Sequence, residues 1–412
     1  MASSRPSTLR AHQNGNGNSR APDTVTFIRT KVLLTGLRRC GKTSIYEVLF
    51  NGMEPKQTFY IETTTKLQKH HYECVATVIP LEVWDCPWNT SPETLGTSLA
   101  EFSALIFVID IQDMYQTPIA KLLEYVVAAA AENPELDIEV FVHKSEALPE
   151  DLKYEHFRHI QTRVLEELYD AEYDHIPLSF HLTSVFDHTL HEAFSRVLHK
   201  LVDSLPYLED LMNVYCANSQ SSKAFLFDVH SRLYVATDSS PVDGATHSLC
   251  CDYLQMLNNF GSLYRHVLSL PPLVTSDICP RSITASPPRS RKPYLPASPL
   301  NDSPASSTKA LSTNSRGSQP KAPSVPLPPP EVRQSKELFY PSASTSLSAT
   351  SSGTTLTYHL VTPALALLSV VPTAIYETRR GLLEYNVVYL REGVQEIYEV
   401  EREARVDTAN GR

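Results

Sequence analysis

Short apolar runs alternate with longer amphipathic stretches through the first half of the chain. The runs predict strands at Lys31–Thr35, Val75–Trp84, Ala104–Asp110, Ile138–His143 and Leu178–Thr183. Between them, apolar residues recur at helical spacing, which predicts helices at Lys42–Phe50, Pro118–Ala131, Asp151–Tyr169 and Leu190–Leu201. Strands that alternate with helices in this way indicate an α/β domain with a mostly parallel sheet, which we assign to residues 28–204.

The pattern changes after residue 204. Two apolar runs, Ala224–Val229 and Leu233–Thr237, flank a short polar turn and predict a hairpin, and a helical stretch follows at Ser248–Arg265. Later in the chain we expect strands at Leu356–Leu360, Leu365–Val371 and Leu382–Tyr389, then a helix at Val394–Arg405. These elements predict a second, α+β domain built from residues 205–270 and 355–405. The alternative is a small third domain after residue 355, which would have a thin core.

Two polar regions lie outside these domains. Residues 271–354 hold 16 of the chain's 30 prolines, together with many serines. Such a segment cannot bury enough apolar surface to offset the entropy lost on ordering, so we expect a disordered Pro/Ser-rich insertion. Residues 1–27 are rich in small and polar residues and predict a disordered arm.

Composition narrows the class of protein. The formal net charge of -10 argues against nucleic-acid binding, because proteins of that class usually carry a basic face. The seven cysteines show no metal-ligand spacing, which is typical of a reducing intracellular setting. The sequence has no signal peptide, no apolar run of membrane-spanning length and no lipidation motif. We therefore expect no direct membrane insertion.

A phosphate-binding motif follows the first predicted strand. Residues 36–43, GLRRCGKT, match GxxxxGK[ST] in full, between the strand and the helix that the motif requires. Lys42 would reach the β- and γ-phosphates, the Thr43 hydroxyl would ligate Mg²⁺, and Ser44 would reach the α-phosphate. The helix N-terminus adds positive potential. The residues expected around the phosphates are Gly36, Arg38, Arg39, Cys40, Gly41, Lys42, Thr43 and Ser44.

A Mg²⁺-linked acid should end a later strand of such a domain. Asp85 directly follows an apolar run and is the candidate for this role. A threonine should complete the metal shell when a γ-phosphate is present, and Thr63, Thr64 and Thr65 offer three choices. The alternative is a run of threonines that only favours extended structure.

Recognition of guanine needs an acidic side chain that accepts two N–H donors. His143-Lys144-Ser145-Glu146 follows a predicted strand, at the place where the [NT]KxD box of GTPases would fall. Lys144 can lie along the base plane, and Glu146 can accept both donors. Thr183 and Ser184 follow the next strand and can bring a backbone N–H to the guanine oxygen. The competing hypothesis is a P-loop ATPase or kinase, which would prefer adenine.

These segments resemble the Rag GTPases. The similarity lies in KVLLTGLRRCGKTS (31–44), ETTTK (62–66), WDCP (84–87), ALIFVIDIQD (104–113), FVHK (141–144) and SFHLTSVFDH (179–188). A longer segment, KAFLFDVHSRLYVATDSSPVD at 223–243, is more similar to the C/D-type Rag subunits, including the fungal counterpart, than to the A/B type.

The resemblance implies a Ras-like GTPase domain followed by a roadblock (longin-like) dimerisation domain, with GTP, GDP and Mg²⁺ as ligands. It implies an A/B-type Rag partner, joined through the roadblock domains, and a lipid-anchored roadblock scaffold complex that tethers the pair. Such heterodimers relay amino-acid sufficiency to the target-of-rapamycin kinase complex at the vacuole or lysosome membrane; the nucleus is a further candidate location. By position, the resemblance assigns the switch I threonine to Thr64, the metal-proximal aspartate to Asp85 and base recognition to His143–Glu146.

The sequence departs from the family pattern at three positions. Trp88 stands where the family has a glycine whose N–H contacts the γ-phosphate, and Asn89 stands where a glutamine orients the attacking water. Glu146 stands where the family has aspartate, one methylene shorter. We therefore expect weak γ-phosphate sensing and slow hydrolysis, and we assign no catalytic residue. The alternative hypothesis is a pseudo-GTPase that keeps the same fold and partner but does not turn nucleotide over.

Overall fold

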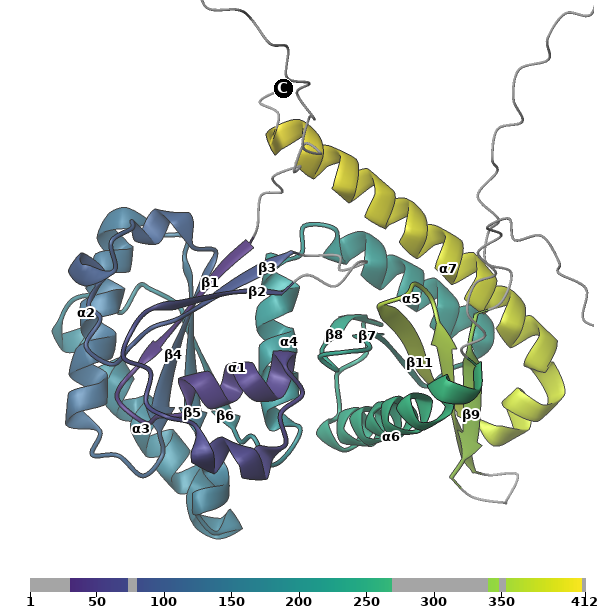
Figure 1. Cartoon of the computed structure of the whole chain (residues 1–412), viewed down its shortest axis with the longest axis horizontal. Coiled ribbons are helices and arrows are strands. Elements are labelled where there is room, and N and C mark those ends of the chain that lie inside the picture. Colours follow the sequence, from purple (N-terminus) through teal and green to yellow (C-terminus); the bar gives the residue numbers. More distant parts are fainter. Residues whose placement is uncertain (1–29, 73–79, 269–339, 348–352, 410–412) are drawn as a thin grey trace, which may run out of the picture. The chain divides into compact units, whose positions relative to one another are not determined.

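The structure is a computed structural model, and it describes residues 30–72, 80–268, 340–347 and 353–409 (Figure 1). The expected N-terminal arm, residues 1–27, lies outside the described residues. So do residues 271–339 of the expected insertion and residues 75–79 of one expected strand.

A six-stranded sheet forms the N-terminal domain, as the alternating pattern predicted. Its strands, in spatial order, are β2 (Gln68–Tyr72), β3 (Leu81–Asp85), β1 (Thr30–Gly36), β4 (Ala104–Asp110), β5 (Asp137–His143) and β6 (Leu178–Thr183). The edge strand β2 is antiparallel to β3, and all other pairs are parallel. All seven residues of β4 are buried, as expected for a central strand covered on both faces.

Helices cover both faces of this sheet. Helices α2 (Gln116–Glu132) and α3 (Glu150–Asp170) pack on one face, and α1 (Lys42–Phe50) and α4 (Thr189–Leu201) pack on the other. Short 3₁₀ helices lie in the connections that the structure describes: η1 (Pro55–Tyr60), η2 (Pro92–Thr94), η3 (Leu99–Glu101) and η4 (Ser145–Ala147). Because the parallel strands all point one way, their carboxyl ends meet at one edge of the sheet, where open α/β sheets bind ligands.

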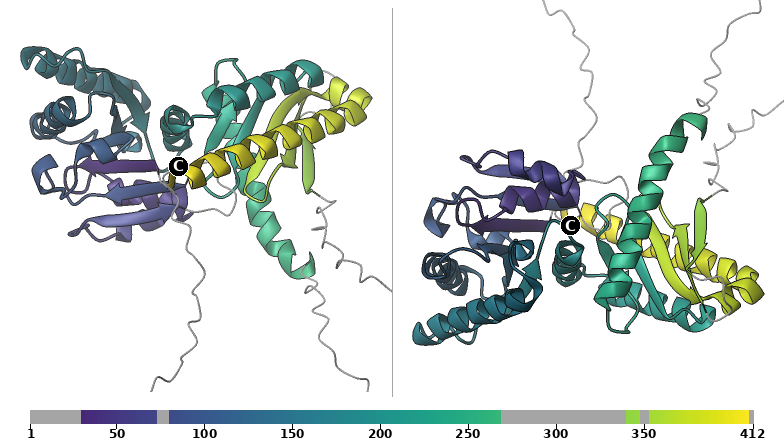
Figure 2. Two further views of the ribbon diagram at one scale, coloured as in Figure 1. Left: turned by 90° about the horizontal axis from the view of Figure 1, so that it is seen from above. Right: turned by 90° about the horizontal axis from the view of Figure 1, so that it is seen from below.

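An antiparallel sheet forms the C-terminal domain. Its strands, in spatial order, are β8 (Tyr234–Thr237), β7 (Lys223–Asp228), β11 (Leu365–Pro372), β10 (Thr354–Leu360) and β9 (Ser342–Ser346). Helices α5 (Leu205–Ser219) and α7 (Thr373–Ala409) cover one face, and α6 (Gly244–Leu268) covers the other (Figure 2). Since β11 pairs with both β7 and β10, segments from before and after the expected insertion share one sheet.

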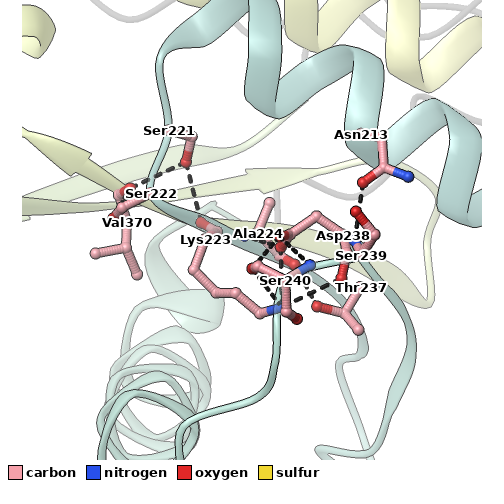
Figure 3. A network of polar contacts seen from close by, with 10 residues as sticks. All are labelled: Asn213, Ser221, Ser222, Lys223, Ala224, Thr237, Asp238, Ser239, Ser240 and Val370. Atoms are coloured by element: carbon pink, nitrogen blue, oxygen red, sulfur yellow. Dashed lines mark hydrogen bonds and ion pairs between the residues drawn. The ribbon is translucent and has the colours of Figure 1, made fainter.

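A buried ion pair fixes the start of β7 (Figure 3). The Lys223 ammonium lies 3.1 Å from Asp238 Oδ1 and donates to the carbonyl of Ser240 at 2.6 Å. The same carboxylate accepts from the Ala224 N–H at 3.0 Å and from the Ser240 hydroxyl. Burial raises the pKa of Asp238, but the hydrogen bonds and Lys223 outweigh it and hold the pKa below its usual range. Lys223, the Ala224 N–H and the Ser240 hydroxyl thus together keep one buried carboxylate ionised.

Several predictions about elements were wrong or incomplete, and helix α5 was not predicted at all. The strand expected at Leu382–Tyr389 is part of helix α7, because the residues that face the sheet recur at helical spacing: Leu383, Val387, Leu390 and Val394. Strand β9 lies inside the segment expected to be disordered. Strand β2 was missed. Both strands consist mainly of polar residues and lie at sheet edges, where backbone pairing alone can hold them.

Candidate nucleotide-binding site

The phosphate motif forms a tight loop between β1 and α1. Gly36 and Gly41 have positive φ angles of 142° and 105°. A Cβ atom on Gly36 would meet the Val108 carbonyl oxygen at 2.4 Å, and one on Gly41 would meet the His143 ring at 2.6 Å. Both glycines are therefore required by close neighbours as well as by backbone conformation.

The Lys42 ammonium is held inside this loop. It donates to the carbonyl oxygens of Gly36 at 2.9 Å and Leu37 at 2.8 Å, and it lies 3.5 Å from the sulfur of Cys40. Burial raises the pKa of the Cys40 thiol, so this cysteine stays protonated and acts as a packing group. The loop thus positions one cation at the N-terminus of α1, an arrangement that suits phosphate.

Two hydroxyls converge on Asp85, at the end of β3. Thr43 Oγ1 donates to Asp85 Oδ2 at 2.5 Å, and Thr64 Oγ1 lies 3.3 Å from the same oxygen. The two hydroxyl oxygens are 2.6 Å apart. Of the three threonines that sequence left open, Thr64 is therefore the one that the structure brings to this group.

This group fits a magnesium ion. Asp85 has no exposed surface, and its Oδ1 atom has no hydrogen-bond partner among the described residues. Burial raises the pKa of Asp85, with Thr43 and Lys42 opposing the change, so its charged form needs a further cation. Among the described residues no three His, Cys, Asp or Glu side chains gather as a metal cluster. Mg²⁺ does not require one, because it binds through few protein oxygens and keeps water and phosphate ligands.

Lys144 connects the base-recognition segment with the phosphate loop. Its ammonium donates to Asp110 Oδ2 at 2.6 Å and to the Arg39 carbonyl at 2.7 Å. Its backbone has a φ of 63°, which is unfavourable for a residue with a side chain. Lys144 therefore links the end of β4 to the phosphate loop, and it also lines the cleft.

His143 supports the loop from behind. Its Nδ1 lies 2.9 Å from the Thr183 hydroxyl in a hydrogen bond, and its ring packs against Gly41. Burial, assisted by the charge of Lys144, lowers the pKa of His143 to about 3, so the ring is neutral at physiological pH. His143 and Thr183 thus hold the ends of β5 and β6 against the phosphate loop.

A cleft of about 800 Å³ opens over these groups. It is lined by Arg38, Arg39, Gly41, Lys42, Thr43, Ser44, Thr58, Phe59, Ile61, Glu62, Thr63, Thr64, Cys86, Trp88, Gln112, His143, Lys144, Glu146, Ala147, Val185 and Phe186. The size is within the range of small-molecule sites. Glu146 is exposed and lines the cleft, so its carboxylate can reach a bound base.

Several expected site residues do not line the cleft. Thr183 and Ser184 are fully buried, and the Ser184 N–H donates to Thr189 Oγ1, so it is engaged within its own loop. Val185 and Phe186 line the cleft in their place. Gly36, Cys40 and Asp85 lie beneath the lining, and Asn89 is exposed outside it.

Sequence reasoning missed the aromatic rim. Phe59, on η1, and Phe186, after β6, both line the cleft, with ring centroids 6.0 Å apart. It also missed Asp110, the carboxylate partner of Lys144. The only available signal for Asp110 was its position at the carboxyl end of a buried strand.

Comparison with known proteins agrees with this geometry. The conserved region of the Gtr1/RagA G proteins matches residues 31–254. The chain belongs to this family. GTP-binding protein gtr2 of Schizosaccharomyces pombe is 43% identical over 246 residues, which cover 59% of this chain and 77% of that protein. Ras-related GTP-binding protein C of Homo sapiens is 40% identical over 240 residues, covering 57% of this chain and 60% of the relative.

Within the family, the chain is of the Rag C/D type, to which gtr2 also belongs. GTP-binding protein gtr1 of Schizosaccharomyces pombe is only 24% identical over 226 residues, covering 53% of this chain and 71% of that protein. The N-terminal domain is a Ras-like G domain that binds guanine nucleotide, and the antiparallel C-terminal sheet fits a roadblock-like domain. No helix in the described part of the chain is both long and apolar enough to cross a membrane.

Proposed function

We propose that this Rag C/D-type chain binds GDP and GTP together with Mg²⁺ and acts as the regulatory subunit of a Rag heterodimer. The convergence of Thr43, Thr64 and Asp85 beside the phosphate loop carries the proposal. These oxygens would hold Mg²⁺, which neutralises charge between the phosphates when it is bound. Lys42 and the loop N–H groups would hold the phosphates, and Lys144 and Glu146 would hold the base.

The proposed partner is an A/B-type Rag subunit, joined through the C-terminal domains. Two features support this: the C/D-type sequence and the roadblock-like antiparallel sheet. We further propose that the pair relays amino-acid sufficiency to the target-of-rapamycin kinase complex at the vacuole or lysosome, where a lipid-anchored roadblock scaffold would tether it.

The test is the nucleotide carried by the chain when it is purified with its partner. We expect extracted nucleotide to be GDP or GTP, and excess EDTA to accelerate its release because Mg²⁺ is removed. An equal concentration of ATP should not displace labelled GDP. Displacement by ATP, or a purified pair without guanine nucleotide, would contradict the proposal and favour an adenine-specific protein.

A second candidate function is that of a pseudo-GTPase scaffold. Trp88 lines the cleft with its side chain 50% exposed, where the family has glycine, and Asn89 lies outside the lining. Single-turnover GTP hydrolysis on the heterodimer separates the two functions. Measurable turnover that increases with an activating protein supports the regulatory GTPase, whereas bound GTP that is never hydrolysed supports the scaffold.

A further inference from the structure

A fully buried phenol connects three parts of the G domain. Tyr125 lies on α2 and has no exposed surface. Its hydroxyl accepts a hydrogen bond from Thr35 Oγ1 at 3.1 Å and donates one to the Thr90 carbonyl at 3.1 Å. The chain of hydrogen bonds therefore runs from β1, through α2, to the loop that follows Asp85.

The two ends of this chain are both next to the nucleotide site. Thr35 directly precedes Gly36, the first residue of the phosphate loop, and Thr90 directly follows Asn89. We call residues 86–90 the Trp88 loop. Its first N–H, that of Cys86, donates to the Leu34 carbonyl at 3.0 Å. The loop is thus fixed at one end by β1 and at the other end by Tyr125, while Trp88 lines the cleft.

Burial strengthens the two hydrogen bonds of the Tyr125 hydroxyl. Thr35 is 2% exposed and Thr90 is 9% exposed, so water has little access to replace either bond. Burial raises the pKa of Tyr125, so the phenol keeps the proton that it donates. A buried carbonyl that loses its donor pays the full desolvation penalty, and Thr90 would therefore have to move toward solvent.

We propose that Tyr125 is a positioning residue that holds the Trp88 loop against the phosphate loop and thereby sets how strongly the protein distinguishes GTP from GDP. The inference rests on the proposed function. GDP lacks the phosphate that would lie nearest to the Trp88 loop, so we expect its binding to depend on the phosphate loop and the base-recognition residues but not on the Trp88 loop. GTP binding additionally requires the Trp88 loop to be ordered, and a loop released from Tyr125 loses conformational entropy on binding.

The test compares Tyr125→Phe with a matched control, in the heterodimer. Tyr215→Phe removes a buried hydroxyl of the same kind, bonded to Ser369 at 3.0 Å, from the C-terminal domain. Dissociation of fluorescent GTPγS and of fluorescent GDP is measured for each variant. We expect Tyr125→Phe to accelerate GTPγS release about three- to tenfold, as for the loss of one or two buried hydrogen bonds, and GDP release by less than about twofold. Tyr215→Phe should change neither rate.

Thr35→Val provides a second variant, since it removes the donor to the phenol but keeps the bond to Thr90. Thr35→Val should also raise the dissociation rate of GTPγS relative to that of GDP, but by a smaller factor than Tyr125→Phe. If Tyr125→Phe accelerates both nucleotides equally, or neither, the positioning role is wrong even though the protein binds guanine nucleotide. If the unaltered heterodimer binds no guanine nucleotide, the proposed function fails first and this inference fails with it.

Discussion

Asp85 combines complete burial with an oxygen that has no hydrogen-bond partner among the described residues. Such an arrangement is unfavourable unless a cation compensates the charge. The two hydroxyls that contact its other oxygen are of a type that binds Mg²⁺, so this small group of oxygens is where we propose the metal to bind.

The threonine run allows a test of that assignment. Thr64→Ala should lower the affinity for GTP in the presence of Mg²⁺ by about tenfold, because one metal ligand is lost. Thr63→Ala should change it by less than about twofold, although Thr63 also lines the cleft. Titration with fluorescent GTP, with Mg²⁺ and with EDTA, measures both. Equal losses in the two variants would contradict the role of Thr64.

His143 makes stability depend on pH. Its pKa is about 3 in the folded protein, against the ordinary histidine value of 6.5 in the unfolded chain, so below pH 6.5 the unfolded chain binds a proton that the folded one does not. The folded state is therefore favoured fully above pH 6.5 and loses stability as the pH falls toward 3, by about 2 kcal/mol at pH 5. His143→Asn should reduce the difference between urea unfolding free energies at pH 7 and pH 5 by about that amount.

An exposed histidine serves as the control for this experiment. His175 is exposed in the folded protein, so His175→Asn serves as the matched variant that removes an imidazole from the surface. If both variants behave alike, the buried ring of His143 is not the source of the effect.

At the scale of elements, strand β7 begins with a buried charge that is paired within its own domain. Lys223→Met should destabilise the C-terminal domain by about 3 kcal/mol, because Asp238 would stay buried without its cation. Asp238→Asn in the same chain should restore part of the loss. The measurement is urea unfolding. Lys153→Met, which removes a surface pair with Glu150, should have a much smaller effect, and a similar loss there would argue against the buried pair.

The elements also show what sequence can predict. The central strands and the phosphate loop were predictable because apolar runs and a glycine motif are local signals. Helix α7 was not, since Leu382–Tyr389 contains enough apolar and aromatic residues to resemble a strand, and only the sheet decides which of them are buried. Strand β9, with the sequence SASTS, has no apolar signal and exists through pairing with β10.

The residues of the candidate site likewise divide into those that sequence motifs predict and those that only the tertiary structure brings together. Lys42, Thr43 and Asp85 followed from motifs, because their roles are set by position after a strand. Phe59 and Phe186 are far apart in sequence and meet only through tertiary structure. Asp110 likewise acquires its role from Lys144, which directly follows the neighbouring strand β5.

At the scale of the whole molecule, β9 divides the long segment between α6 and β10 into a part that we expect to be dispensable and a part that belongs to the sheet. Deleting residues 280–335 should leave unfolding and heterodimer formation nearly unchanged, because loop-closure entropy depends only weakly on length. Extending the deletion to residue 350 removes β9 and exposes the edge of β10. We expect this longer deletion to lower the thermal midpoint by several degrees, since each kcal/mol of lost stability lowers the midpoint of a small domain by about 4–8 °C.

Thermal unfolding and size-exclusion chromatography with the partner chain measure both deletions. If the shorter deletion abolishes heterodimer formation, residues 280–335 contribute to the interface with the partner chain. If the longer one has no effect, β9 does not stabilise the sheet.

The position of β11 between β7 and β10 has a consequence for synthesis on the ribosome. All strands of the G-domain sheet precede residue 184, so that domain can close early. Strand β7 can pair with β8 at once, but its other edge meets its partner β11 only after residue 372 has emerged. During that interval an apolar strand edge remains open to wrong pairing. The Pro/Ser-rich segment therefore also sets how long the nascent chain has to wait for its second domain.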